Sequence, residues 1–196
     1  VLLFDEKQVF DQVIEEGEFP LFSNSYLLLI GKKPQTVYAK FSNDRAKAWA
    51  IRTLIHKSAA GTFLVEKQPN DKEANAHIVH TYQAYEALSK RYEGTKIRMN
   101  ECKRTPQSIV FPFCPGKTLE ELLDERLDEQ DAEGFRKLIE EYMYWLSYNE
   151  EANVSNIDFI FPNILVDGDT WHVIDYEWTF DRTVPAKDIA FRAFYN

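Results

Sequence analysis

The chain has 196 residues, which suits one domain of ordinary size or two small lobes that share an interface. Hydrophobic residues make up 44% of it, with only 7 Gly and 8 Pro, so a folded core is expected rather than disorder. A formal net charge of -9 argues against nonspecific binding to nucleic-acid phosphates, which requires a surplus of Lys and Arg. No uncharged apolar run approaches the roughly 18 to 20 residues of a membrane span.

The cysteines and the chain ends indicate the context of the protein. Cys102 and Cys114 are too few and too unpatterned for a disulfide framework or a zinc site, so we expect ordinary thiols and a cytoplasmic location. The first residue is Val1, and the last residues stop inside an expected amphipathic helix. We therefore expect a piece of a longer polypeptide.

The first part of the chain predicts an antiparallel sheet followed by a long helix. Strands are expected at residues 25–31, 36–42, 49–57 and 62–68, with Gly61 in a tight hairpin between the last two. The helix is expected from an N-cap at Asp71 to Tyr92, because apolar residues recur there at spacings of three and four, and Gly94 ends it.

The second part predicts mainly helices. Strands are expected at residues 96–105 and 107–113, and the Pro and Gly residues of segment 112–116 then interrupt the pattern. Thr118 and Glu121 form an expected capping box at the start of one helix. Residues 131–151 predict another helix, whose core-facing stripe is Phe135, Leu138, Ile139, Tyr142, Met143 and Leu146.

Residues 156–178 carry the polar groups that suggest chemistry. Two short strands are expected around a turn at Asp167 and Gly168, with Asn163 at the entrance of the hairpin and Asp175 at its exit. A hairpin brings its outer ends together, so Asn163 and Asp175 should lie close, and Asp158 in the preceding loop can curl back over them. An amide oxygen and a carboxylate are suitable ligands for Mg²⁺.

This pattern resembles the protein-kinase-like superfamily, and especially its small-molecule branch, the aminoglycoside and choline phosphotransferases. Asp158, Asn163 five residues later and the strand-borne Asp175 match the catalytic Asp, the metal-binding Asn and the metal-binding Asp of that family. The resemblance implies an α+β, two-lobed fold with ATP and Mg²⁺ as cofactors. Residues 1–111 would form the sheet-containing N-lobe with its αC helix, residues 112–116 the hinge, and residues 117–196 a short, mainly helical C-lobe.

The order of the first part agrees with the resemblance. Lys67 matches the phosphate-binding Lys on the third kinase strand, because a long helix follows it, and Lys40 on an earlier strand is the rival. The family also implies a glutamate on αC that pairs with this Lys. We favour Glu86 for that role, with Glu73 as the alternative.

The hinge and three departures complete the comparison with the family. The adenine-binding carbonyl and N–H of a kinase hinge correspond to Pro112 and Cys114, and a proline can supply a carbonyl. No Gly-rich loop is present, so the backbone of residues 42–48 or Arg45 would have to cover the phosphates. Asn156 stands where kinases have His, and residues 175–177 are Asp, Tyr and Glu instead of Asp, Phe and Gly.

The flanking segments show a narrower resemblance. VIDYEWTFD, AFRAFYN and HIVHTYQAYEAL resemble bacterial kinase modules found beside methyltransferase or glycosyltransferase modules in surface-polysaccharide proteins, including those that terminate O-antigen chains. That resemblance implies a glycan or small-molecule acceptor and a protein that could associate with membranes through its fusion partners. Two function classes remain open: an active phosphotransferase, and a catalytically inactive module that binds a nucleotide or a partner.

Overall fold

The computed structural model describes residues 13, 15, 16, 36–42 and 44–195. Contacts divide the chain into two units, Val1–Pro34 and Gln35–Asn196, and the fold described here is that of the second unit. The strand expected at residues 25–31 lies outside the described residues. Within the described part, no helix has the length and apolarity that crossing a membrane requires.

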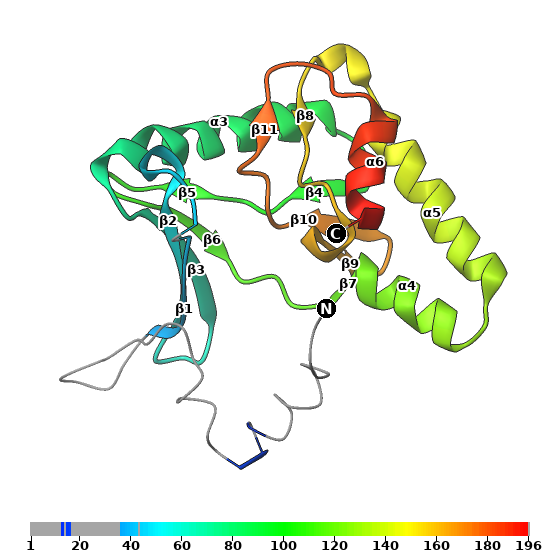
Figure 1. Cartoon of the computed structure of the whole chain (residues 1–196), viewed down its shortest axis with the longest axis horizontal. Helices are drawn as coiled ribbons and strands as arrows, with labels where there is room; N and C mark the ends of the chain where they lie inside the picture. Colours follow the sequence, from blue (N-terminus) through cyan, green and yellow to red (C-terminus); the bar gives the residue numbers. More distant parts are fainter. Residues whose placement is uncertain (1–12, 14, 17–35, 43, 196) are drawn as a thin grey trace, which may run out of the picture. The chain divides into compact units, whose positions relative to one another are not determined.

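A five-stranded antiparallel sheet forms the first part of this unit (Figure 1). Its strands, in spatial order, are β1 (Thr36–Phe41), β2 (Ile51–Lys57), β3 (Phe63–Pro69), β6 (Ile109–Pro112) and β5 (Lys103–Arg104). Val65 in the middle of the sheet lies opposite Ile55 on one side and Phe111 on the other. The turn between β2 and β3 contains Gly61 at a φ of 86°, a conformation that favours glycine. The expected antiparallel sheet is therefore confirmed over the described strands.

A long helix follows β3 and packs against it, as expected from the sequence. A short 3-10 turn, η2 (Lys72–Ala74), leads into α3 (Asn75–Arg91). The side chain of Asp71 accepts a hydrogen bond from the Glu73 N–H and caps the start. The buried face of α3 consists of His77, Ile78, Thr81, Ala84, Leu88 and Arg91. One face of the helix thus joins the core, while its single acidic residue, Glu86, is exposed.

A second sheet has four strands, β4 (Ile97–Met99), β10 (Thr170–Val173), β9 (Ile164–Asp167) and β7 (Lys117–Thr118). The single strand expected at residues 96–105 is wrong, because β4 runs parallel to β10 in this sheet while β5 belongs to the first. Asn100 marks the break: its N–H donates to the Val173 carbonyl at 2.8 Å, and its side-chain amide donates to the Pro112 carbonyl at 3.1 Å. The segment after α3 therefore belongs to both sheets.

The expected hairpin is present, with β9 and β10 antiparallel and a loop of Gly168 and Asp169. Gly168 has a φ of 55°, which suits the glycine at this turn. Two further short strands pair with each other: β8 (Ser155–Asn156), which precedes Asp158, and β11 (Thr179–Phe180), which follows Asp175. Asp158 and Asp175 are thus fixed to one another by backbone pairing on both sides.

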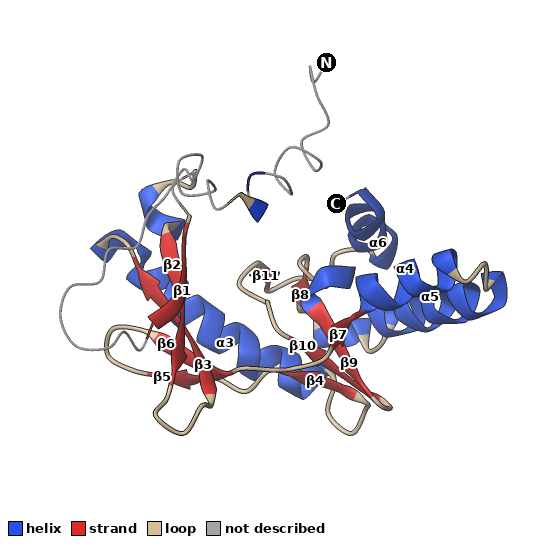
Figure 2. Ribbon diagram, turned by 90° about the horizontal axis from the view of Figure 1, so that it is seen from below, coloured by secondary structure: helices blue, strands red, loops and turns tan. Residues whose placement is uncertain are grey.

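Three helices pack in series beside the second sheet: the first on strands β7 and β9, the second against the first, and the third against the second (Figure 2). They are α4 (Leu119–Asp128), α5 (Ala132–Ser147) and α6 (Ala186–Tyr195), and short 3-10 turns occur at η1 (Lys47–Trp49), η3 (Glu150–Ala152) and η4 (Phe161–Asn163). The capping box of Thr118 and Glu121 is confirmed. The expected apolar stripe of α5 packs in the core, where the buried Tyr142 hydroxyl donates to the Phe159 carbonyl at 2.7 Å. The helix-rich second part of the chain is confirmed.

Candidate functional site

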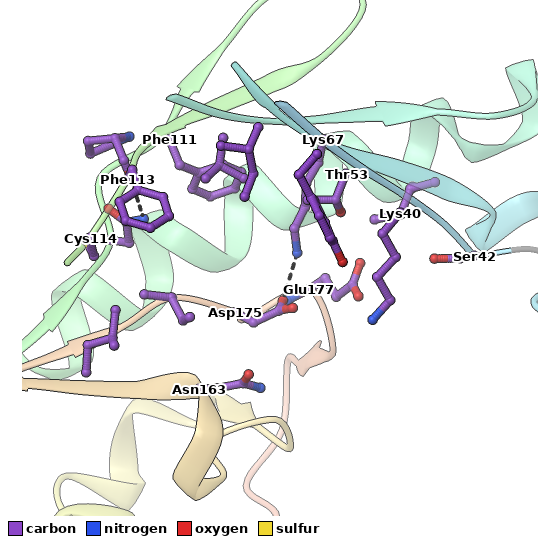
Figure 3. A pocket seen from close by; sticks show the side chains of 18 of the residues that line it. Lys40, Ser42, Thr53, Lys67, Phe111, Phe113, Cys114, Asn163, Asp175 and Glu177 are labelled. Carbon is purple, nitrogen blue, oxygen red and sulfur yellow. Dashed lines mark hydrogen bonds and ion pairs between the residues drawn. The ribbon is translucent and has the colours of Figure 1, made fainter. Parts of the chain in front are cut away.

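A cavity of about 300 Å³ is lined by residues of the five-stranded sheet and of the hairpin that carries β9 and β10 (Figure 3). One part of the lining is apolar and consists of Ile51, Ile55, Val65, Phe111, Leu165 and Ile174. The other part is charged or amide-bearing and consists of Lys40, Arg45, Lys67, Asn100, Asn163, Asp175 and Glu177. Such a cavity suits a ligand with a flat apolar ring at one end and anionic groups at the other.

Lys67 and Asp175 meet across this cavity (Figure 3). Lys67 Nζ lies 3.0 Å from Asp175 Oδ1, although the two residues are 108 positions apart. Burial alone would lower the pKa of Lys67, but the charges of Asp175 and Glu177 raise it, so the ammonium stays charged. The ion pair places a buried cation and a carboxylate that is 30% exposed in the charged part of the cavity.

The hairpin brings Asn163 and Asp175 to the same cavity, as the sequence predicted. Ile164 is paired with Val173, and the Asn163 carbonyl accepts a hydrogen bond from the Ile174 N–H at 3.0 Å. The Asn163 side-chain Nδ2 donates to the Asp158 carbonyl at 3.0 Å. Because that contact uses the amide nitrogen, the amide oxygen of Asn163 is left to accept or to ligate.

Asp158 contacts Asn163 through its backbone carbonyl but does not line the cavity. Its side chain is 10% exposed, and Arg192 Nη2 on α6 lies 2.8 Å from its Oδ1. Burial raises the pKa of Asp158, while the hydrogen bond from Arg192 acts in the opposite direction. The carboxylate is thus held on the side of the cavity that faces α6.

Asn156, which replaces the expected His, connects the two acidic segments. Its Oδ1 accepts from the Asp158 N–H at 2.9 Å, and its Nδ2 donates to the Asp175 carbonyl at 3.0 Å. Asn156 is 3% exposed, so both hydrogen bonds are shielded from water. An amide that donates and accepts at the same time can fix the spacing of the two backbones.

The structure does not bring Glu86 to Lys67. Glu86 is exposed on α3, and so is Glu73 near the start of the helix. On α3 it is His77 that contacts a charged residue of the cavity: its Nε2 lies 3.2 Å from Glu177 Oε2. The helical period explains the difference, since His77 is aligned with the buried residues of α3 and Glu86 is not.

The predicted hinge residues lie at the apolar part of the cavity, next to Phe113. The Pro112 carbonyl already accepts the side-chain amide of Asn100. Cys114 is half-buried, and no described residue accepts a hydrogen bond from its N–H. Segment 112–114 therefore has a carbonyl that already accepts one hydrogen bond and an N–H that no described residue uses.

Two groups at this site escaped the interpretation of the sequence. Glu177 was noted only as a departure from the kinase pattern, yet it is 4% exposed and lines the cavity. A carboxylate between two aromatic residues, Tyr176 and Trp178, was the signal that could have identified it. His77 had no sequence signal, because its helical face is defined only by the packing of α3. Arg45, an expected phosphate cover, lines the cavity as well.

Comparisons with known proteins gave one kind of match. No protein-family model matches the chain, and no curated protein matches it either. Among solved structures, the chain matches macrolide 2'-phosphotransferase MphH from Brachybacterium faecium, at 11% sequence identity and a TM-score of 0.41. That alignment covers 96% of this chain and 82% of the other. The roles of individual residues are therefore inferred from the geometry of this chain.

Proposed function

We propose that this chain is an ATP- and Mg²⁺-dependent phosphotransferase that acts on a hydroxyl group of a non-protein acceptor. The observation that carries the proposal is the contact of Lys67 with Asp175, at 3.0 Å, inside a cavity that also contains Asn163. A cation for phosphate oxygens, a carboxylate and an amide oxygen are the groups that hold a metal nucleotide in phosphotransferases. Their convergence from two separate sheets supports the kinase-like interpretation.

The nucleotide would lie with its base in the apolar part of the cavity. There the Cys114 N–H and the Pro112 carbonyl would contact the base edge, and Val65 and Leu165 would enclose its faces. Residues up to 111 would form an N-lobe, with α3 in the place of αC, and residues 117–196 a C-lobe across the 112–116 hinge. The pairing of β4 with β10 modifies this division, because it ties the segment after α3 to the second sheet.

The residues present fit a magnesium ion. Asp175 offers a partly exposed carboxylate and Asn163 an amide oxygen, and both line the same cavity. Mg²⁺ usually takes one or two protein oxygens and completes its shell with water and phosphate oxygens. The described residues contain no group of three His, Cys, Asp or Glu side chains that would hold a metal without a nucleotide. A bound magnesium ion would neutralise phosphate charge.

Asp158 is the group that we propose to accept the proton of the acceptor hydroxyl. Its backbone is fixed by Asn156 and Asn163, and its carboxylate contacts Arg192 without lining the nucleotide cavity. A base there adds nothing to nucleotide binding and would act only when an acceptor is present. The acceptor would enter from the side of α6, where Arg192 now occupies Oδ1 of Asp158.

The sequence resemblance extends the proposal to the acceptor and the cellular context. The acceptor would be a glycan terminus or another small hydroxyl compound, as in the bacterial O-antigen modules that segments such as VIDYEWTFD resemble. The chain would work in the cytoplasm, where its free thiols Cys102 and Cys114 stay reduced. Methyltransferase or glycosyltransferase modules of the same polypeptide would then be its neighbours, and they could attach it to a membrane.

Two observations favour a second candidate function. Asp158 is paired with Arg192 rather than open to the cavity, and residues 42–48 lack the glycines of a phosphate-covering loop. A module that binds a nucleotide without transferring phosphate would have the same cavity and no need for a free base. The two candidates differ only in phosphate transfer.

The test is transfer of labelled γ-phosphate from ATP to mannose- or rhamnose-terminated glycans and to small hydroxyl compounds. The parent should transfer phosphate only with Mg²⁺, and Asp175→Asn should not. Asp169→Asn is the matched control, because Asp169 is exposed in the loop of the same hairpin and outside the cavity. ATP binding without transfer to any acceptor or to water would favour the binding module. Absence of ATP binding would contradict both candidates.

A further inference from the structure

Glu177 is held by side chains from two different elements. Arg45, in the loop between β1 and β2, donates from Nη1 to Oε1 at 2.9 Å, and His77 on α3 lies 3.2 Å from Oε2. The three side chains differ in burial: those of His77 and Glu177 are 3% and 5% exposed, while that of Arg45 is 28% exposed. Glu177 therefore connects the segment after Asp175 to α3 and to the loop over the cavity.

Aromatic rings enclose this connection. Trp178 packs on His77 with 5.2 Å between the ring centroids, and the Arg45 guanidinium lies 5.4 Å from the centroid of the same Trp178 ring. Trp49 of η1 contacts Trp178 at 5.9 Å. The rings reduce the access of water to both hydrogen bonds, which strengthens the electrostatic attraction between the charged groups.

The buried face of α3 provides no carboxylate for Lys67. The negative charges near Lys67 come instead from Asp175 and Glu177, which both act on its ammonium group. A metal bound to Asp175 would weaken the attraction between Asp175 and Lys67, and Glu177 would then remain as the counter-charge. The kinase pattern would place the acid on the helix. Here α3 supplies His77 instead, and the acid, Glu177, lies in the segment after β10.

We propose that Glu177 is a positioning residue that replaces an α3 carboxylate, holding α3 and the Arg45 loop in place around Lys67. This inference rests on the proposed phosphotransferase function. Glu177 would not bind the metal, which Asn163 and Asp175 would hold. It would instead orient Arg45 and Lys67 toward the phosphate end of the cavity. Arg45 would then cover the phosphates from a loop that lacks the usual glycines.

Loss of the Glu177 charge should have opposite effects on binding and on transfer. The cavity would keep the cations Lys40, Arg45 and Lys67 with one anion fewer, so ATP without metal should bind Glu177→Gln about 3- to 10-fold more tightly. Phosphate transfer should fall by about 30-fold or more, because Arg45 and α3 are no longer held. The KM for Mg-ATP should change little. A purely structural residue would not produce this split.

Hydrogen exchange gives a readout that does not need the acceptor. In Glu177→Gln without ligand, amides of residues 44–50 and 75–79 should exchange about tenfold faster or more, while those of α5 stay at the parent rate. Glu177→Asp restores the charge but is too short to reach both partners. It should therefore return the affinity for metal-free ATP to the parent value while exchange in the two segments stays fast.

The controls separate this inference from the proposed function. Glu93→Gln changes an exposed carboxylate just after α3 and should match the parent in every assay. If Glu177→Gln loses the Mg²⁺-dependent gain in ATP affinity as Asp175→Asn does, Glu177 is a metal ligand and the inference is wrong. It is also wrong if exchange in both segments is unchanged, or if Glu86→Gln, and not Glu177→Gln, impairs transfer. Failure of the parent to bind ATP would instead contradict the proposed function.

Discussion

Arg192 Nη2 on the last described helix lies 2.8 Å from Asp158 Oδ1, across 34 positions of sequence. This contact joins α6 to the loop that carries the proposed base. It leaves Oδ2 as the oxygen that can face an acceptor. Burial raises the pKa of Asp158, and the hydrogen bond from Arg192 opposes that rise. α6 is therefore part of the proposed acceptor side, and the contact can be tested separately from nucleotide binding.

Replacing Arg192 should weaken transfer without affecting the nucleotide. Burial raises the pKa of Asp158 and Arg192 opposes that rise, so in Arg192→Ala the pKa should rise further. A base must be deprotonated to act, so the acidic limb of the pH profile of kcat should move to higher pH. The expected loss of kcat is about 10- to 100-fold at neutral pH, with ATP affinity unchanged. Lys187→Ala, an exposed change on the same helix, is the control.

Asp158→Asn should retain nucleotide binding and lose transfer. The amide keeps the size of the side chain but cannot accept a proton, so transfer should fall by about 10² to 10⁴. The pKa of Asp158 is raised in the folded state, so its ionisation above that pKa disfavours folding. The variant should therefore be at least as stable as the parent at pH 7, with the difference shrinking as the pH falls and Asp158 is protonated. Denaturant melts at several pH values measure this. A loss of ATP binding as severe as that of Asp175→Asn would contradict the assigned role.

The Glu177 carboxylate should stabilise the metal-free fold in a pH-dependent way. Burial would raise its pKa, but the hydrogen bond from His77 and the charges of Lys67 and Arg45 lower it from 4.5 to about 2. A depressed pKa stabilises the fold above the unfolded value, and this contribution is lost as the pH falls toward 2. Glu177→Gln should therefore be less stable than the parent at pH 7, by a few kcal/mol at most. Urea melts should show the difference disappear between about pH 4.5 and pH 2; a constant difference would contradict it.

Tyr142 should stabilise the loop that carries Asp158. Its buried hydroxyl donates to the Phe159 carbonyl at 2.7 Å, next to the proposed base. Tyr142→Phe keeps the ring and leaves this carbonyl unpaired, which should cost about 1 to 2 kcal/mol in the free energy of unfolding. Tyr144→Phe on the exposed face of α5 is the matched control and should cost almost nothing. Equal urea midpoints for the two variants would show that the hydrogen bond contributes no stability.

The sequence predicted the parts of the site that depend on local patterns. The hairpin around Gly168 has a period of two and a glycine turn, so the proximity of Asn163 and Asp175 could be predicted from the segment alone. The strand with Lys67 and the helix after it follow from the same kind of pattern. These features are decided within about 20 residues of sequence.

The remainder depends on packing between distant segments. The split of residues 96–105 into β4 and β5 follows from Asn100 bonding to Val173 and Pro112, which no local pattern shows. The choice of His77 over Glu86 depends on which face of α3 packs against distant elements such as β3 and β11. Likewise, the contact of Arg192 with Asp158 exists only because α6 packs against α5. Charged residues at such positions resemble ordinary surface charges in the sequence.

Thermal unfolding with ATP and Mg²⁺, each alone and together, tests the central claim most directly. At about 100 times the dissociation constant, Mg-ATP should stabilise the parent by about 2.7 kcal/mol, or a Tm increase of about 5 to 10 °C, and more than either component alone. Lys67→Met should lose most of this shift, while Lys90→Met, an exposed change on α3, should keep it. Equal shifts in Lys67→Met and the parent, or no shift in the parent, would contradict a nucleotide site built around Lys67 and Asp175.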